Sequence, residues 1–316
     1  MLEKSRGLVA DCIIYDLEDS VARSEKAEAR SRLRQLLDLP RPKTVHEQAV
    51  RINAIDSGMA FDDLGKIVSR IGAFGTSSQR LIRNVFQLKC ENLDSIVVPK
   101  VQSAADLRSV ADAIKHHAPH RCMLDHGASA SVLNSKSSSR NTRPLQLIGL
   151  IESARGLLSL ADICTATPFL SGIAFAAEDF ALDLSLVHTP SRLEMLHARS
   201  TIVTACRAFN VPSVIDLVST EFKGQSGQQR LKEDCLFGQS LGFNGKQCIH
   251  PLQLEPVQAA FGPSQREIEW ATRVVAGASQ AENKGKGAWS LEGQMIDAPI
   301  IARAERTLEK ARRFGS

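Results

Sequence analysis

The chain has 316 residues, of which 43% are hydrophobic and only 5% aromatic, and its formal net charge is +4. This length suits one large domain or two small ones. The mild positive charge favours an anionic ligand, but no basic run is interleaved with aromatic residues, so the sequence argues against a nucleic-acid partner. No apolar run reaches the roughly 20 residues that span a bilayer, and we expect a soluble protein without a membrane partner.

Seven cysteines are scattered along the chain, and no two form a CxxC pair. An odd number without metal-ligand spacing predicts free thiols in a reducing compartment rather than a disulfide or zinc framework. The first residues, MLEKSRGLVADC, lack the apolar core of a signal peptide.

Short apolar runs alternate with helical patterns from residue 12 to residue 249. The runs are nearly all apolar, which is typical of strands buried on both faces in a parallel sheet. They lie at Cys12–Leu17, Ala49–Ile52, Ser95–Pro99, Leu145–Ile151, Ser171–Ala176, Ser213–Leu217 and Gln247–Ile249. Helices are predicted at Ser24–Leu37, Phe61–Ile71, Ser103–His116, Ser153–Ala166, Ser191–Asn210 and Gly227–Leu241. The alternation predicts an α/β fold.

Seven strands are one fewer than a (β/α)₈ barrel needs. Gly75–Asn84 and the Ser-rich His126–Arg143 have the composition of loop insertions. After Pro251 the alternation stops, and helices are predicted at Gln253–Phe261, Ser264–Asn283 and Ala298–Arg313. We therefore divide the chain into a barrel domain, residues 1–250, and a C-terminal helical segment, residues 251–316, that packs on the barrel or on a neighbouring subunit.

Polar residues follow the apolar runs at nearly every predicted strand end. In a (β/α)₈ barrel these positions converge on the face where active sites are built. A strand that simply stops at a polar residue explains any single case, but seven ends rich in carboxylate, Arg and Lys favour a site. The residues are Glu18, Asp19, Arg51, Asn53, Lys100, Glu152, Glu178, Asp179, Asp216 and His250.

Two carboxylates on consecutive strand ends predict a divalent cation. Glu152 ends one run and Asp179 follows the next, so their side chains should be neighbours. Hard oxygen ligands completed by water and substrate are typical of Mg²⁺, with Mn²⁺ as an alternative. Glu18 and Asp19 could hydrogen-bond to metal-bound water. The alternatives are a helix-terminal charge for Glu152 and a turn cap for Asp179.

Three further residues carry two readings each. Arg51 can clamp a substrate carboxylate through paired hydrogen bonds, or can pair with Glu18 or Asp19. Lys100 can serve the same anionic site or can be an exposed strand end. His250 can belong to the site or can be a structural hydrogen-bonding residue at the rim, and the second is the prediction.

Nine motifs, in order from residue 4 to residue 305, resemble the citrate lyase β-subunit-like family of the HpcH/HpaI aldolase superfamily. They are ADCIIYDLEDSV with AEAR, VRIN, VVPKV, IGLIESARGLL, IAFAAEDF, IDLV, LGFNGKQCIHPLQ, FGPS and GKGAWSLEGQMIDAP. The last of these is most similar to the citramalyl-CoA lyase branch. The resemblance implies a (β/α)₈ TIM barrel assembled as a homotrimer, acting on an acyl-coenzyme A substrate.

The resemblance also implies roles for individual residues. It places Mg²⁺ on Glu152 and Asp179 and the substrate carboxylate on Arg51. Asp297, in the MID motif, matches the family's catalytic Asp, which is contributed across a subunit contact. Without the resemblance, Asp297 is predicted to be the N-cap of the last helix, and only the resemblance favours a catalytic role. Ligand contacts are implied for Ile215 and Asp216, and a coenzyme A contact for Lys4.

This chain departs from the family pattern at two places. It opens inside the helix that follows the family's first strand, so we expect a barrel that lacks its first strand and has a C-terminal helical extension. Ala177 stands where the family has Gly beside the metal site. A targeting segment would lie upstream, so mitochondrial and cytoplasmic locations both stay open.

The function expected from these residues is Mg²⁺-dependent, retro-Claisen-type cleavage of a 3-hydroxyacyl-CoA, with citramalyl-CoA giving pyruvate and acetyl-CoA. The alternatives are a malyl-CoA lyase or thioesterase, a malate-synthase-like enzyme, and an inactive truncated paralogue. The malyl-CoA lyase, the thioesterase and the malate-synthase-like enzyme would all use the same metal carboxylates and the same arginine.

Overall fold

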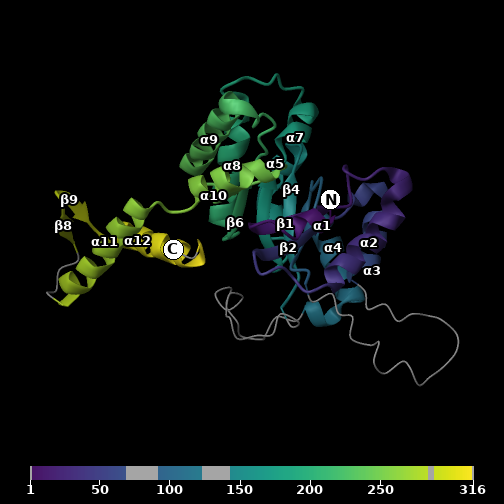
Figure 1. The fold of residues 1–316 in the computed structure, drawn as a ribbon, viewed down its shortest axis with the longest axis horizontal. Coiled ribbons are helices and arrows are strands. Elements are labelled where there is room, and N and C mark those ends of the chain that lie inside the picture. The colour runs from purple at the N-terminus through teal and green to yellow at the C-terminus, as the bar shows by residue number, and fades with distance from the viewer. Residues whose placement is uncertain (1, 69–91, 123–142, 284–287, 315–316) are drawn as a thin grey trace. The chain divides into compact units, whose positions relative to one another are not determined.

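The computed structural model describes residues 2–68, 92–122, 143–283 and 288–314 (Figure 1). The two predicted loop insertions, Gly75–Asn84 and His126–Arg143, therefore lie outside the described residues, except for Arg143. Cys90 also lies outside them. The six described cysteines are free thiols, as predicted. No helix within these ranges combines the length and the hydropathy of a membrane-spanning segment.

Within the described ranges, seven parallel strands form one sheet in chain order. They are β1 (Ala10–Asp16), β2 (Val45–Arg51), β3 (Ser95–Val98), β4 (Gln146–Ile151), β5 (Leu170–Phe175), β6 (Ser213–Asp216) and β7 (Gly245–Lys246). All four side chains of β3 are buried, as is expected of a strand with helices outside and a core inside. The parallel seven-stranded sheet confirms the predicted barrel-type fold with one strand fewer than eight.

Helices follow the strands in the described part of the chain. They are α1 (Leu2–Ser5), α2 (Lys26–Asp38), α3 (Ala60–Val68), α4 (Ala104–His117), α5 (Ala154–Leu158), α6 (Leu160–Cys164), α7 (Ala177–Leu184), α8 (Leu196–Ala208), α9 (Gly224–Leu241), α10 (Leu254–Phe261), α11 (Gln265–Asn283) and α12 (Ala298–Phe314). Short 3₁₀ helices occur at Arg23–Glu25, Ile55–Ser57, Pro119–Arg121, Leu193–Met195 and Pro251–Gln253. A capping box formed by Ser103 and Asp106 begins α4.

The sequence misplaced some boundaries. The seventh strand is Gly245–Lys246 and not Gln247–Ile249. The backbone N–H groups of Ile249 and His250 donate to the side-chain oxygen of Gln253, at 2.7 and 3.1 Å, so this apolar stretch forms a cap instead of a strand.

The segment from Ser153 to Ala166 is two short helices, because the chain leaves helical geometry at Ser159. Only Ala176 separates the end of β5 from the start of helix α7. The sequence analysis did not predict this helix.

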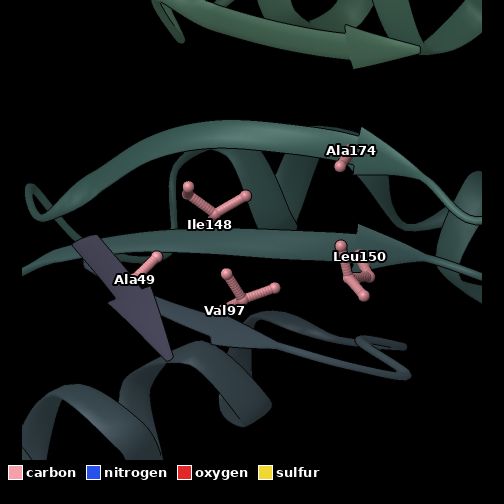
Figure 2. Close-up of a cluster of buried hydrophobic side chains, with 5 residues drawn as sticks. All are labelled: Ala49, Val97, Ile148, Leu150 and Ala174. Atoms are coloured by element: carbon pink, nitrogen blue, oxygen red, sulfur yellow. The ribbon is translucent and has the colours of Figure 1, made fainter. Parts of the chain in front are cut away.

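A cluster of buried apolar side chains lies between the central strands of the sheet (Figure 2). It consists of Ala49, Val97, Ile148, Leu150 and Ala174, from β2 to β5, and all five are at most 5% exposed. Because side chains alternate between the two faces of a strand, the residues two positions further along β2 and β4 continue the same face. Those residues are Arg51 and Glu152, so the cluster supports the polar groups at the strand ends.

The chain divides into two compact units, residues 1–218 with 241–247, and residues 219–240 with 248–316. The first unit contains the sheet. In the second, α11 and α12 pack on the antiparallel hairpin of β8 (Trp289–Leu291) and β9 (Gln294–Ile296) through a buried cluster that includes Val274 and Ile296. The hairpin lies in the Gly-rich stretch for which the sequence predicted no element. The domain boundary predicted at residue 250 stays a prediction.

Candidate functional site

Arg51 occupies the end of β2, and its guanidinium is surrounded by carboxylates. The register places Asp16 of β1 directly beside it. Asp16 accepts two parallel hydrogen bonds, from Nε and from Nη2 of Arg51, each 2.7 Å long. Glu18 and Asp19, on the loop after β1, lie 2.9 and 3.7 Å from Nη1. Both predicted ion-pair partners of Arg51 are therefore present, and Asp16 is a third.

The ion pair of Asp16 and Arg51 lowers the pKa of the carboxyl and raises that of the guanidinium, so both groups stay charged. Burial of Asp16 opposes ionisation, but the hydrogen bonds from Arg51 and Ser20 outweigh it and lower the pKa to about 2. Burial lowers the pKa of Arg51, but the carboxylates of Asp16, Glu18 and Asp19 have a larger, opposite effect, so the pKa lies above its ordinary value. Arg51 is thus a permanent cation that is anchored at one side.

Glu18 is held by the buried ammonium of Lys26 on α2. Lys26 Nζ donates to the backbone carbonyls of Leu17 and Glu18, at 2.7 and 2.5 Å. Burial, opposed in part by Arg51, raises the pKa of the Glu18 carboxyl to about 7. Its two oxygens are buried, and within the described residues neither has a hydrogen bond of ordinary geometry. Asp19 is exposed.

Glu152 stands next to Asp179, as the sequence predicted. Glu152 is 4% exposed, and in the described part of the chain neither carboxylate oxygen has a hydrogen bond of ordinary geometry. Burial raises its pKa to about 8, and the neighbouring carboxyls of Asp179 and Glu18 add to the rise, while the backbone N–H of Lys100 opposes it. A buried acceptor without a donor is costly unless a cation or a proton reaches it.

The alternative roles at helix ends hold for Asp179 in part but not for Glu152. Ser153, not Glu152, caps α5, because its hydroxyl accepts the backbone N–H of Gly156. Asp179 lies in the first turn of α7, a favourable position for negative charge, and is partly buried. Ala177 is buried at the start of that helix.

The carboxylates suit a hard divalent cation. No three His, Cys, Asp or Glu side chains in the described ranges form a complete protein cage. Mg²⁺ commonly takes one or two protein carboxylates and fills its other positions with water and substrate. The buried, unsatisfied oxygens of Glu152 and the adjoining Asp179 fit that requirement.

Lys100 brings a second cation to the same strand ends. Its ammonium lies 3.9 Å from Glu18, and its side chain is 44% exposed. Burial lowers its pKa, but the carboxylates of Glu18, Asp179, Asp19 and Glu152 raise it overall. Lys100 has a φ of 52°, a left-handed conformation that is uncommon for a residue with a side chain.

Asp216, at the end of β6, has a different environment. Its carboxylate is fully buried and accepts hydrogen bonds from Nε and Nη2 of Arg199, at 3.1 and 2.5 Å, with Lys246 Nζ 3.9 Å away. Ile215 packs against the interior cluster. The ligand contacts implied for Ile215 and Asp216 stay predictions, and Asp216 as placed is satisfied by protein.

The remaining candidates are Lys4, Asp297 and His250, and each is described by its own local contacts. Lys4 is exposed on α1. Asp297 belongs to the second unit, and its Oδ1 accepts the backbone N–H of Ile300 at 3.3 Å, so it caps α12. His250 stacks on Phe222 and accepts the N–H of Leu252, which confirms its structural reading. The catalytic and coenzyme A roles of Asp297 and Lys4 stay predictions.

Sequence reasoning overlooked Asp16 and Lys26. Asp16 lies inside the apolar run CIIYDL, two residues before Glu18 and in register with Arg51. If the first two predicted strands had been aligned in parallel with their charged C-terminal residues in register, Asp16 would have been identified as the neighbour of Arg51. Lys26 is a lysine at the start of a helix and has no distinguishing sequence signal, because its burial depends on the folded loop.

The fold and these residues define a class of protein. A parallel barrel-type sheet that gathers buried carboxylates, an arginine and a lysine at its carboxyl edge is the arrangement of (β/α)-barrel enzymes. Sequence comparisons agree: the model of "HpcH/HpaI aldolase/citrate lyase" matches residues 1–76 and 74–251, and that of "C-C_Bond_Lyase of the TIM-Barrel fold" matches residues 197–316.

Individual relatives cover almost the whole chain. The mitochondrial citramalyl-CoA lyase of Homo sapiens is 31% identical over 98% of this chain and 81% of its own length. A (3S)-malyl-CoA thioesterase of Cereibacter sphaeroides is 33% identical over 98% and 90%. The structure of protein CitE from Mycobacterium tuberculosis with magnesium, acetoacetate and coenzyme A is 28% identical, covers 96% and 91%, and superposes with a TM-score of 0.62. The chain belongs to the HpcH/HpaI aldolase/citrate lyase family and is a carbon–carbon lyase.

Proposed function

We propose that this lyase cleaves a 3-hydroxyacyl-coenzyme A, with citramalyl-CoA as the substrate that it cuts into pyruvate and acetyl-CoA. The observation that carries the proposal is the buried Glu152 with the partly buried Asp179 as its neighbour, because within the described residues neither Glu152 oxygen has a hydrogen-bond partner. The named activity of the Homo sapiens relative supports the choice of substrate.

The metal carboxylates of the proposed site are Glu152 and Asp179. They would hold Mg²⁺, or Mn²⁺ in its place, and the bound ion would supply Lewis-acid stabilisation of negative charge on the substrate hydroxyl oxygen. Solved relatives support this choice, since CitE was crystallised with magnesium. Glu18 and Asp19 would hydrogen-bond to water and substrate at the edge of this site.

Arg51 orients the substrate carboxylate. Its guanidinium is fixed by Asp16 through two hydrogen bonds, so the N–H groups that remain have a defined direction. A pre-oriented cation lowers the entropic cost of placing the scissile bond.

Cleavage breaks the bond between the hydroxyl-bearing carbon and the methylene next to the thioester. The hydroxyl proton leaves to the carboxylate cluster, the oxygen becomes the keto oxygen of pyruvate, and the electron pair of the broken bond forms the thioester enolate. Asp297 then protonates the methylene carbon, which completes acetyl-CoA. In this proposal Asp297 comes from a neighbouring copy in a homotrimer, and Lys4 contacts the coenzyme A.

The direct test is product analysis. Purified protein is incubated with citramalyl-CoA, malyl-CoA and citryl-CoA, with Mg²⁺ and with chelator, and the products are separated. We expect pyruvate and acetyl-CoA from citramalyl-CoA in the presence of Mg²⁺ alone. Equal rates with and without Mg²⁺, or no cleavage of any of the three, would refute the proposal.

A malyl-CoA thioesterase is the second candidate, favoured by the 33% identity to the Cereibacter sphaeroides enzyme. The same incubation separates it from the first, because a thioesterase releases free coenzyme A and malate, with the carbon skeleton intact. For the compartment we propose mitochondria, after the Homo sapiens relative, and imaging of the tagged full-length protein tests this.

A further inference from the structure

Arg51 is not a free anion clamp, because carboxylates of the protein already surround its guanidinium. Its Nε and Nη2 atoms donate to Asp16 at 2.7 Å, and its Nη1 atom lies 2.9 Å from Glu18. Of the five N–H donors of the guanidinium, two are therefore bonded to Asp16, and the Nη1 group is paired electrostatically with Glu18. A substrate carboxylate that relied on Arg51 alone would have to share it with these carboxylates.

Lys100 has donors available. Its nearest carboxylate oxygen, Oε1 of Glu18, is 3.9 Å from Nζ, which is beyond hydrogen-bond distance. Within the described ranges its ammonium makes no hydrogen bond, although it carries three N–H donors. Since 44% of the side chain is exposed, an incoming anion can reach it.

The backbone at Lys100 explains how the ammonium comes to this place. The residue follows β3 and adopts a φ of 52°, which glycine takes without strain and lysine does not. Its ammonium lies 3.9 Å from Glu18, and the charges of Glu18, Asp179 and Asp19 raise its pKa. Strained backbone at a cluster of unsatisfied groups is typical of functional positions.

We propose that Lys100 is a substrate-binding residue whose ammonium contacts the carboxylate of the small-acid portion, together with Arg51. When Glu18, Asp19, Glu152 and Asp179 are ionised, they repel an anionic substrate, and a second cation beside Arg51 offsets that repulsion. This inference rests on the proposed function, because it assigns the carboxylate contact of that same site.

The test compares Lys100→Gln with the wild-type protein by calorimetric titration. Mg²⁺ is titrated alone, and pyruvate is then titrated in the presence of Mg²⁺. Removal of the ammonium should weaken pyruvate binding by about tenfold or more, because a charge-assisted hydrogen bond is lost. The same change should tighten Mg²⁺ binding severalfold, because a positive charge beside the metal carboxylates is removed.

Two further variants keep the result interpretable. Lys100→Gly relieves the left-handed backbone, so its unfolding temperature should not fall, yet pyruvate binding should weaken as in Lys100→Gln. Lys115→Gln removes an exposed lysine on α4 and should change neither titration.

Pyruvate affinity within twofold of the wild type in Lys100→Gln would overturn the inference. So would a joint loss of Mg²⁺ and pyruvate binding, because that pattern marks a structural role. Normal titrations in a wild-type protein that cleaves no acyl-CoA would refute the proposed function and leave the Lys100 contact standing.

Discussion

Two clusters of charge lie at the carboxyl ends of strands in the same sheet, and they differ in how their carboxylates are satisfied. At the end of β6, Asp216 is fully buried between Arg199 and Lys246 and accepts two hydrogen bonds. At the end of β4, Glu152 is almost as deeply buried, yet in the described part of the chain its oxygens have no such donors, and its pKa rises to about 8. Cations of the protein neutralise the first carboxylate, and we propose that the second binds a ligand.

The difference shows that a polar strand end is not by itself a functional position. A buried carboxylate that is fully paired contributes to folding, because removing it leaves its cations uncompensated. A buried carboxylate that is unpaired opposes folding, and such groups persist where binding or catalysis requires them. Substitutions at the two clusters should therefore have opposite effects on stability and activity.

The largest expected effect is on turnover at the β4 end. Glu152→Gln removes one of the two proposed metal carboxylates, and we expect kcat/KM to fall by about 10³-fold or more. Steady-state assays with citramalyl-CoA measure this. The matched control is Glu178→Gln, which removes an exposed carboxylate next to Asp179 and should stay within about threefold of the wild type. An equal loss in both variants would contradict the distinction between them.

At the β6 end, the expected loss is in stability. Asp216→Asn leaves Arg199 and Lys246 without their buried counter-ion, and the free energy of unfolding should fall by about 3 kcal/mol. Urea denaturation measures it, with the exposed Asp112→Asn on α4 as the control. A variant as stable as the wild type would show that Asp216 is not a structural carboxylate.

Asp297 sharpens the comparison, because it caps α12 and is also the proposed proton donor. Asn caps helices about as well as Asp, so Asp297→Asn should keep the free energy of unfolding within a few tenths of a kcal/mol. Turnover should nevertheless fall by about 10²-fold, since an amide cannot deliver the proton. Retention of turnover together with stability would leave capping as its role.

The smallest effect is the pH dependence of stability in cation-free protein. Burial keeps the pKa of Glu152 near 8, above its ordinary value of 4.5, so the folded protein holds this proton when the unfolded chain has released it. The stability associated with Glu152 is present below about pH 4.5 and is lost as the pH rises towards 8.

Glu152→Gln should therefore gain stability relative to the wild type between pH 5 and pH 8.5, by about 2 kcal/mol at the upper end. Thermal and urea unfolding in the presence of chelator measure the gain. A variant that is less stable than the wild type at pH 8.5 would mean that the Glu152 carboxylate is satisfied after all.

Much of this molecule could be predicted from its sequence. The apolar runs gave the strands because a parallel sheet buries both faces, and Glu152 and Asp179 were found because they end adjacent runs. Arg199 was not found, since it lies in a helix and meets Asp216 only in the folded structure. Lys100 was left open, because neither its left-handed backbone nor the engagement of Arg51 can be read from residue order.

The same limit explains the errors at the element boundaries. The apolar Gln247–Ile249 has the composition of a strand. However, the side chain of Gln253 accepts the backbone N–H groups of Ile249 and His250, and the last strand ends at Lys246. Side-chain capping competes with the ladder of a short edge strand, and composition alone does not decide that competition.

The central claim is that Glu152 and Asp179 share one divalent cation. Crystals of the protein soaked in Mn²⁺, with diffraction data collected at the manganese edge, test it most directly. We predict one anomalous peak within coordination distance of both carboxylates, about 2.0–2.3 Å from an oxygen of each, and its loss in Glu152→Gln. Full occupancy at another position, with these two carboxylates left without metal, would contradict the account.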